Sequence, residues 1–244
     1  AQRISSINSI AALCEATGAD IREVSRAIGL DSRIGPKFLN SSPGFGGSCF
    51  KKDILNLVYL SKYYGLKDVG NFWESVVKLN NWHQHRISKL IIKKLFGTIS
   101  GKKISILGFA FKSNTNDTRE SAAISICKDL LEEGAILCIH DPKVDPIQIE
   151  KDLGIPPKLP RDIYKHDNES LWFSSKNYEE IFENSDAAVF LTEWEEYKNI
   201  NWKIISKKMR KPAWIFDARS ILIPENIIQE GLYLWRIGDG TEYK

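Results

Sequence analysis

The sequence has few cysteines and no long apolar run. Four cysteines occur in 244 residues without paired spacing, which disfavours a disulfide framework and indicates a reducing compartment. Three of them fall at apolar positions of predicted elements and are expected in the core: Cys14, Cys127 and Cys138. No signal peptide and no apolar run long enough to span a bilayer is found. We therefore expect a cytoplasmic protein without a membrane partner.

The sequence also has little excess charge. Its formal net charge of +3 is too small to indicate nucleic acid or a membrane surface as a partner. His83 and His85 have no carboxylate or cysteine at metal-ligand spacing, so no metal site is predicted. The composition is that of an ordinary soluble globular protein.

The beginning of the chain lacks two features. It has no initiator methionine, and no residue precedes Ala1 to cap the helix that Ile4, Ile7 and Ile10 predict. We expect the chain to be a piece of a longer polypeptide.

Residues 1–97 show helical periodicity. Within them, residues 68–96 form one helical pattern that spans roughly 40 Å at about 1.5 Å per residue. A helix of this length is typical of a domain connector or of a packing surface for a second copy, and we expect both. The sequence predicts an all-helical central domain over residues 1–97 and a homodimer or higher homo-oligomer.

From residue 98 the pattern changes to alternating strands and helices. Strands are predicted at 103–109, 135–140, 171–174, 187–191, 213–216 and 232–237, and helices at 120–133, 178–184 and 202–209. The polar stretch 143–169 is predicted to run over the surface. Residues 98–244 are therefore predicted to form an α/β domain with a Rossmann-like, mostly parallel, doubly wound sheet. Such sheets bind ligands at the carboxyl ends of their strands.

A glycine-rich loop within residues 41–53 brings Cys49 to the start of an apolar helix. A thiol in the first helical turn beside Lys51 and Lys52 is favoured as the thiolate, so Cys49 is a candidate nucleophile. Asp53 follows one turn later, where it could activate a water for hydrolysis of a thioester. The alternative is a tight turn with a small buried cysteine. The helix residues predicted to be buried are Ile54, Leu55, Leu57, Val58 and Leu60.

Several residues near strand ends and helix starts suit a phosphate. The turn at 108–112 reads Gly-Phe-Ala-Phe-Lys, not Gly-x-Gly-x-x-Gly, and so does not predict a dinucleotide pyrophosphate site. It suits a mononucleotide, with Phe111 as a stacking face and Lys112 as a phosphate ligand, or else a strand end with a solvent lysine. Arg119 precedes a helix, although capping explains most of its segment. Arg219 follows a strand end where such sheets gather ligands.

Residues 44–53, Gly-Phe-Gly-Gly-Ser-Cys-Phe-Lys-Lys-Asp, strongly resemble the catalytic cysteine segment of UDP-glucose 6-dehydrogenases of the eukaryotic type, in the UDP-glucose/GDP-mannose dehydrogenase family. The resemblance runs from residue 1 to about residue 238. Its other specific segments are 1–9, 108–112, 116–121 and 216–219.

The resemblance implies a role for each matching residue. Cys49 would form a thiohemiacetal and then a thioester, and Asp53 would help its hydrolysis. Residues implied to contact the UDP-sugar are Asn40, Ser41, Ser42, Pro43, Gly44, Phe45, Gly46, Phe111, Lys112 and Arg219. Arg33 would reach the sugar from the partner subunit. Residues implied to line the cofactor NAD are Cys49, Phe50, Lys51, Lys52 and Arg119. Asn40 replaces a lysine of animal members, which leaves a phosphate contact at this position open.

The resemblance also implies a part that precedes this chain. Family members carry an amino-terminal Rossmann domain for NAD with a catalytic glutamate, followed by a lysine and an asparagine. We expect NAD-dependent oxidation of UDP-glucose to UDP-glucuronate by the whole enzyme and no turnover by this chain alone. Alternatives are a dehydrogenase for another nucleotide sugar, such as GDP-mannose or UDP-N-acetylmannosamine, or a non-catalytic nucleotide-sugar binding or dimerisation module. The phenylalanine after the cysteine, followed by Lys-Lys-Asp, favours glucose.

Overall fold

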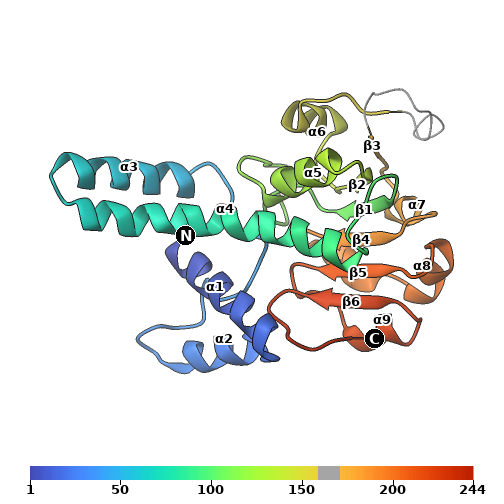
Figure 1. Cartoon of the computed structure of the whole chain (residues 1–244), viewed down its shortest axis with the longest axis horizontal. Helices are drawn as coiled ribbons and strands as arrows, with labels where there is room; N and C mark the ends of the chain where they lie inside the picture. Colours follow the sequence, from blue (N-terminus) through green and yellow to red (C-terminus); the bar gives the residue numbers. More distant parts are fainter. Residues whose placement is uncertain (159–170, 244) are drawn as a thin grey trace.

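The computed structural model describes residues 1–158 and 171–243, and in them it has a helical part and a six-stranded sheet (Figure 1). The helices of the first part are α1 (Gln2–Thr17), α2 (Ile21–Leu30), α3 (Phe50–Tyr63) and α4 (Lys67–Lys94). The strands are β1 (Lys103–Leu107), β2 (Ile136–His140), β3 (Trp172–Ser174), β4 (Ala187–Phe190), β5 (Trp214–Asp217) and β6 (Tyr233–Arg236). The helices among them are α5 (Ala122–Glu132), α6 (Pro146–Leu153), α7 (Tyr178–Ile181), the 3-10 helix η2 (Glu195–Asn199), α8 (Trp202–Lys208) and α9 (Pro224–Ile228).

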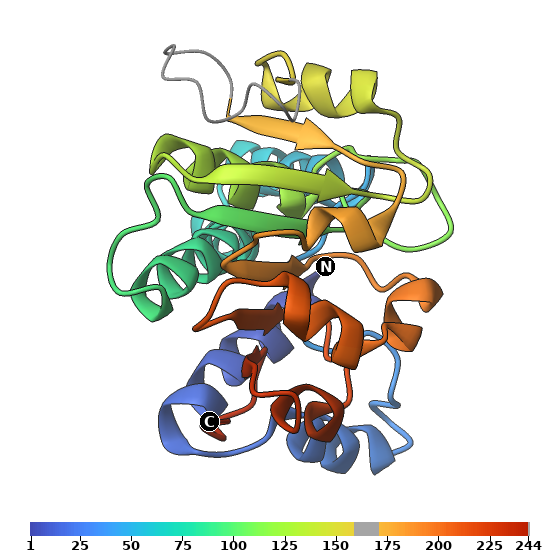
Figure 2. The ribbon, with the colours of Figure 1, turned by 90° about the vertical axis from the view of Figure 1, so that its right-hand side faces the viewer.

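The sheet is parallel and has the strand order β3-β2-β1-β4-β5-β6. Figures 1 and 2 show the six strands stacked in this order. The chain moves outward from β1 in one direction to β3, then crosses back to β4 and continues to β6. Reversal of the strand order beside the first strand is the mark of a doubly wound sheet, whose ligands bind outside the carboxyl ends at that point. The predicted α/β fold class is confirmed.

The core of the sheet is covered on both faces. Every residue of β1 and β2 is buried, as expected for parallel strands covered on both sides. Cys127 and Cys138 lie in this core and Cys14 is buried between α1 and α2, so these three predictions are confirmed. Burial raises the pKa of Cys138 to about 12 and raises that of Cys127 as well.

The long predicted helix is present as α4, with 28 residues. Its first half pairs with α3 in a hairpin that extends away from the sheet (Figure 1). Its second half enters the sheet core through Ile87 and Ile91, which are fully buried. The helix therefore runs continuously from the hairpin into the α/β part. Within the described ranges, no helix is both long enough and apolar enough to cross a membrane.

Two predictions about local structure are wrong. Leu55, Leu57 and Leu60 of α3 are 46%, 37% and 41% exposed, because α3 packs mainly against α4 and buries only one side. The stretch 143–169 contains α6, whose start is capped by the Asp145 side chain and whose end is a left-handed glycine. These are ordinary helix start and stop signals. The part of that prediction over 159–169 lies outside the described residues.

The segment after β6 returns to the helical part, where it meets the turn between α1 and α2. The Gly238 carbonyl accepts a hydrogen bond from Ile21 N at 2.8 Å, and Gly240 N donates to Ala19 O at 2.9 Å. Asp239 pairs with Arg22 at 3.0 Å. The beginning of α2 is therefore held by a segment that follows the last strand.

Candidate functional site

Buried polar side chains from α1 and α4 hold the glycine-rich loop. Asn80 Oδ1 accepts from Phe45 N at 2.9 Å, and Asn80 Nδ2 donates to Phe45 O at 3.3 Å. Asn8 Oδ1 accepts from Ser42 N at 3.0 Å, and His83 Nε2 lies 3.0 Å from Ser42 O. Burial and, to a lesser degree, the charge of the nearby Arg86 guanidinium lower the pKa of His83 to about 3. The imidazole is therefore neutral at pH 7, and because a carbonyl only accepts, its proton is on Nε2.

The loop passes between α4 and the segment that follows β1, with room only for glycine at two positions. Gly44 has φ +147°, and a Cβ there would lie 2.8 Å from Asn80 Oδ1. A Cβ on Gly46 would lie 2.5 Å from the Glu120 carbonyl oxygen and 2.9 Å from Phe111 Cβ. Real Cβ atoms do not approach this closely, so a larger residue would push the loop off its support.

The loop delivers Cys49 to the N-cap of α3, where its thiol is exposed. Ser48 Oγ lies 3.5 Å from Cys49 Sγ. Asp53 is in the first turn of the helix. Lys51 Nζ pairs with Glu120 at 2.7 Å, across the junction with the α/β part. Free backbone N–H groups at a helix start favour a negative charge. The position of Cys49 therefore suits a nucleophile, and this role stays a prediction.

Arg119 lies near this thiol. Its pKa is raised, chiefly by its hydrogen bond and ion pair with Asp117 and to a lesser degree by the neighbouring Cys49. The guanidinium is exposed and lies 2.7 Å from Asp117. A short backbone bond, Gly47 N to Arg119 O at 2.8 Å, joins the two loops. The fold therefore brings together two segments that the sequence separates widely.

A large cavity of about 1080 Å³ opens between the glycine-rich loop, α2 and the carboxyl ends of β1, β4 and β5. This is the location where doubly wound sheets bind ligands, and the size suits a small-molecule ligand. Ten predicted site residues line it: Asn40, Ser41, Ser42, Gly44, Phe45, Gly46, Phe50, Phe111, Lys112 and Arg219.

The Arg219 side chain lines this cavity and contacts two of the loops that form it. Its Nε donates to Leu191 O at 2.7 Å, and its Nη2 donates to Phe111 O at 3.0 Å. Its Nη1 lies 3.1 Å from Glu193 Oε2. Burial lowers the pKa of Arg219 from its usual value. The Arg219 side chain therefore joins the loops after β1 and β4.

The remaining predicted residues lie outside the large cavity. Pro43, Cys49, Lys51, Lys52 and Arg119 do not line it. Arg33 is also absent from its lining, because its side chain is 87% exposed and pairs with Asp31 at 2.6 Å.

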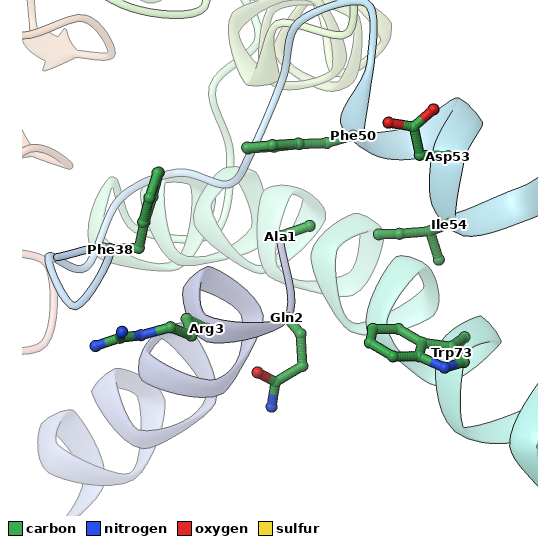
Figure 3. Close-up of a pocket in the computed structure, with 8 residues that line it drawn as sticks. All are labelled: Ala1, Gln2, Arg3, Phe38, Phe50, Asp53, Ile54 and Trp73. Carbon is green, nitrogen blue, oxygen red and sulfur yellow. The ribbon is translucent and has the colours of Figure 1, made fainter. Parts of the chain in front are cut away.

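Asp53 lines a second, smaller cavity of about 330 Å³ (Figure 3). Figure 3 shows Phe50 and Asp53 at the start of α3, opposite Gln2 and Arg3 of α1. Phe38 and Phe50 line both cavities. The two cavities are therefore neighbours separated by these aromatic rings.

The turn after β1 does not offer a pyrophosphate site. The backbone N–H groups of Phe109 and Ala110 both donate to Asp141 Oδ2, at 2.7 and 3.0 Å. In a dinucleotide-binding turn such groups face the phosphates. A carboxylate already occupies them here, so the described residues of this sheet do not fit the pyrophosphate of NAD at its usual place.

Several lining residues were not predicted from the sequence: Ile4, Ile21, Arg22, Ser25, Arg26, Pro36, Phe38, Leu39, Glu193, Lys198, Ser220 and Ile221. Arg22 and Arg26 are four residues apart and share one face of α2, which is a weak signal for a cationic wall. In the described part of the chain, no three side chains of the metal-binding types come together.

Fold and cavity define an α/β protein with a ligand cleft at the edge of a Rossmann-like sheet. Residues 1–82 match the central domain of the UDP-glucose/GDP-mannose dehydrogenase family, and residues 105–224 match the UDP binding domain of the same family. The chain belongs to the UDP-glucose/GDP-mannose dehydrogenase family.

Curated relatives agree with this assignment. The chain is 51% identical over 240 residues to a UDP-glucose 6-dehydrogenase of Drosophila melanogaster, covering 98% of this chain and 49% of that protein. It is 52% identical over 223 residues to a UDP-glucose 6-dehydrogenase of Bos taurus, covering 91% and 44%. The chain spans about half the length of these relatives.

Solved structures show the same fold. A UDP-glucose dehydrogenase structure from Pyrobaculum islandicum superposes with a TM-score of 0.77 at 24% identity, covering 98% of this chain and 48% of that one. At this level of identity the likeness concerns the fold alone.

Proposed function

We propose that this chain is the central and UDP-binding part of an NAD-dependent UDP-glucose 6-dehydrogenase that makes UDP-glucuronate. The observation that carries the proposal is the large cavity, which gathers ten of the predicted site residues next to the helix that begins at Cys49. We also propose that residues 1–97 form the central domain and residues 98–244 the UDP-binding domain.

In this proposal the nucleotide sugar lies in the large cavity with C6 of the glucose toward the start of α3. Phe111 and Lys112 line the cavity, and Lys112 Nζ lies 5.4 Å from the Phe111 ring centre. Lys112 is placed to bind phosphate and the Phe111 ring to cover the nucleoside. Glycine at positions 44 and 46 lets the backbone approach the sugar closely.

The chemistry proceeds in two oxidations and one hydrolysis. The C6 hydroxyl first gives up its proton while carbon C6 gives up a hydride, which leaves an aldehyde. The Cys49 thiolate adds to the aldehyde carbon to give a thiohemiacetal in its alkoxide form, and loss of a second hydride from C6 leaves a thioester. A water activated by Asp53 adds to the thioester carbonyl, the carbon–sulfur bond breaks, and the carboxylate product leaves with the thiolate restored.

NAD, when bound, accepts one hydride in each oxidation. In this chain Cys49, Phe50, Lys51, Lys52 and Arg119 are proposed to border it. Because Asp141 occupies the N–H groups after β1, we propose that the dinucleotide is held mainly by a part of the enzyme outside this chain.

We also propose that the active enzyme is at least a dimer. The hairpin of α3 and α4 exposes large apolar side chains, among them Tyr59, Tyr63 and Phe72, and such a surface favours a partner that covers it. Arg33 is exposed and outside its own cavity, which supports a contact with the sugar of the partner subunit. The four cysteines are all unpaired, which supports a cytoplasmic location.

NADH formation from UDP-glucose tests the proposal. The 244-residue chain should produce no NADH, whereas the same chain joined to the remaining half of the enzyme should produce two NADH per UDP-glucose. In the joined enzyme, Cys49→Ala should stop turnover before the acid is formed. A joined enzyme that does not oxidise UDP-glucose, or a chain that oxidises it alone, would contradict the proposal.

A further inference from the structure

The large cavity is lined by an excess of positive charge. Its cationic residues are Arg22, Arg26, Lys112, Lys198 and Arg219, and among the described residues Glu193 is the one carboxylate that lines it. Glu193 is itself paired with Arg219 at 3.1 Å. A cavity of this charge favours a ligand with more than one negative charge, such as a diphosphate.

Most of these cations already have protein partners. Arg22 pairs with Asp20 at 2.6 Å and with Asp239 at 3.0 Å. Lys198 pairs with Glu195 at 2.6 Å. Arg219 is held by two backbone carbonyls as well as by its carboxylate. A new anion would compete with these bonds.

Arg26 differs from these three residues, and so does Lys112, whose ammonium group contacts the Phe111 ring. In residues 1–158 and 171–243 Arg26 makes no hydrogen bond or ion pair, yet it lines the cavity from α2. A guanidinium remains charged at every physiological pH and offers several N–H donors in a planar fork that matches a phosphate. An unpaired guanidinium facing a cavity is therefore ready to bind an anion without breaking a bond.

The wall that presents Arg26 is firmly positioned. Ser25 Oγ, on the preceding residue, donates to the carbonyl of Leu39. This bond ties α2 to the loop that carries Asn40, which contributes an amide to the cavity but no charge. The start of the same helix is fixed by the bond from Ile21 N to Gly238 O at 2.8 Å.

We propose that Arg26 binds the diphosphate of the nucleotide in this cavity and supplies the positive charge that Asn40 does not provide. The inference rests on the proposed function, because it takes the ligand to be a uridine diphosphate compound. It goes beyond that function by assigning a recognition role to α2. A single charge-assisted contact to phosphate corresponds to roughly a tenfold gain in affinity.

Calorimetric titration of the 244-residue chain with UDP and with uridine tests this role. Arg26→Gln should weaken UDP binding about tenfold and leave uridine binding unchanged, since only UDP carries the phosphates. Arg26→Lys should restore part of the UDP affinity. The affinity of Arg26→Gln for UDP should also fall less with added salt than that of the parent chain. Lys207→Gln, an exposed change on α8 outside the cavity, is the charge-matched control and should behave like the parent.

A second variant tests the link with position 40. Adding Asn40→Lys to Arg26→Gln should recover UDP affinity, because the new ammonium would enter the cavity from the adjacent loop. If the parent chain binds UDP and Arg26→Gln binds it equally well, the role of Arg26 is overturned while the proposed function stands. A loss of equal size for uridine and UDP would overturn it too, since it would indicate a structural effect. Failure of the parent chain to bind UDP would overturn the proposed function and the diphosphate assignment together.

Discussion

Replacing Asn80 by alanine tests whether the glycine-rich loop depends on α4. Asn80 is 5% exposed and makes two hydrogen bonds to the backbone of Phe45, at 2.9 and 3.3 Å. Alanine removes both bonds and leaves a buried N–H and a buried carbonyl without a partner. At roughly 1–3 kcal/mol for each unsatisfied group, we expect a loss of about 3 kcal/mol in the free energy of unfolding. For a chain of this size that corresponds to a fall of roughly 6–12 °C in Tm.

Asn81 provides a matched control, because it is the same residue type on the same helix and is exposed. In denaturant unfolding and thermal melts, Asn80→Ala should show the whole loss in the free energy of unfolding and in Tm, and Asn81→Ala should stay close to the parent. UDP affinity should fall in Asn80→Ala alone, since the loop that lines the cavity loses its support. Equal melting temperatures for the two variants would refute the reasoning.

Three further predictions concern single side chains. Iodoacetamide should label Cys49 first in the folded chain, because Cys49 alone among the described cysteines is exposed and burial raises the pKa values of Cys127 and Cys138. Peptide mapping measures the labelling, and equal labelling of Cys138 would contradict this prediction. The pKa of His83 is about 3 in the folded chain and 6.5 ordinarily. Between these two pH values the unfolded chain binds one proton more than the folded chain, so the free energy of unfolding should fall as the pH falls, by up to about 1.4 kcal/mol per pH unit. His83→Gln, which keeps an N–H donor, should flatten that dependence in unfolding curves at pH 4 to 7. Arg33→Ala should leave a dimer intact in sedimentation runs at micromolar concentration and weaken UDP-glucose binding in the joined enzyme; a monomeric parent chain or unchanged affinity would count against the shared site.

Local sequence determined much of this molecule. Strand and helix periods predicted the alternation of elements from β1 to β6 and the length of α4, because both depend on repeated apolar positions. The glycines before Cys49 predicted a loop that leads into a helix. These features are encoded by neighbouring residues, which is why they can be read without the fold.

The tertiary structure decided which distant residues share a site. Arg26 and Arg219 line one cavity because the segment around Gly238 holds α2 beside the sheet, and no local pattern encodes that contact. The same reason explains the failure for Leu55 and Leu57. Their helical spacing predicted an apolar face, but burial depends on whether another element covers it, and in this chain α4 covers only one side of α3.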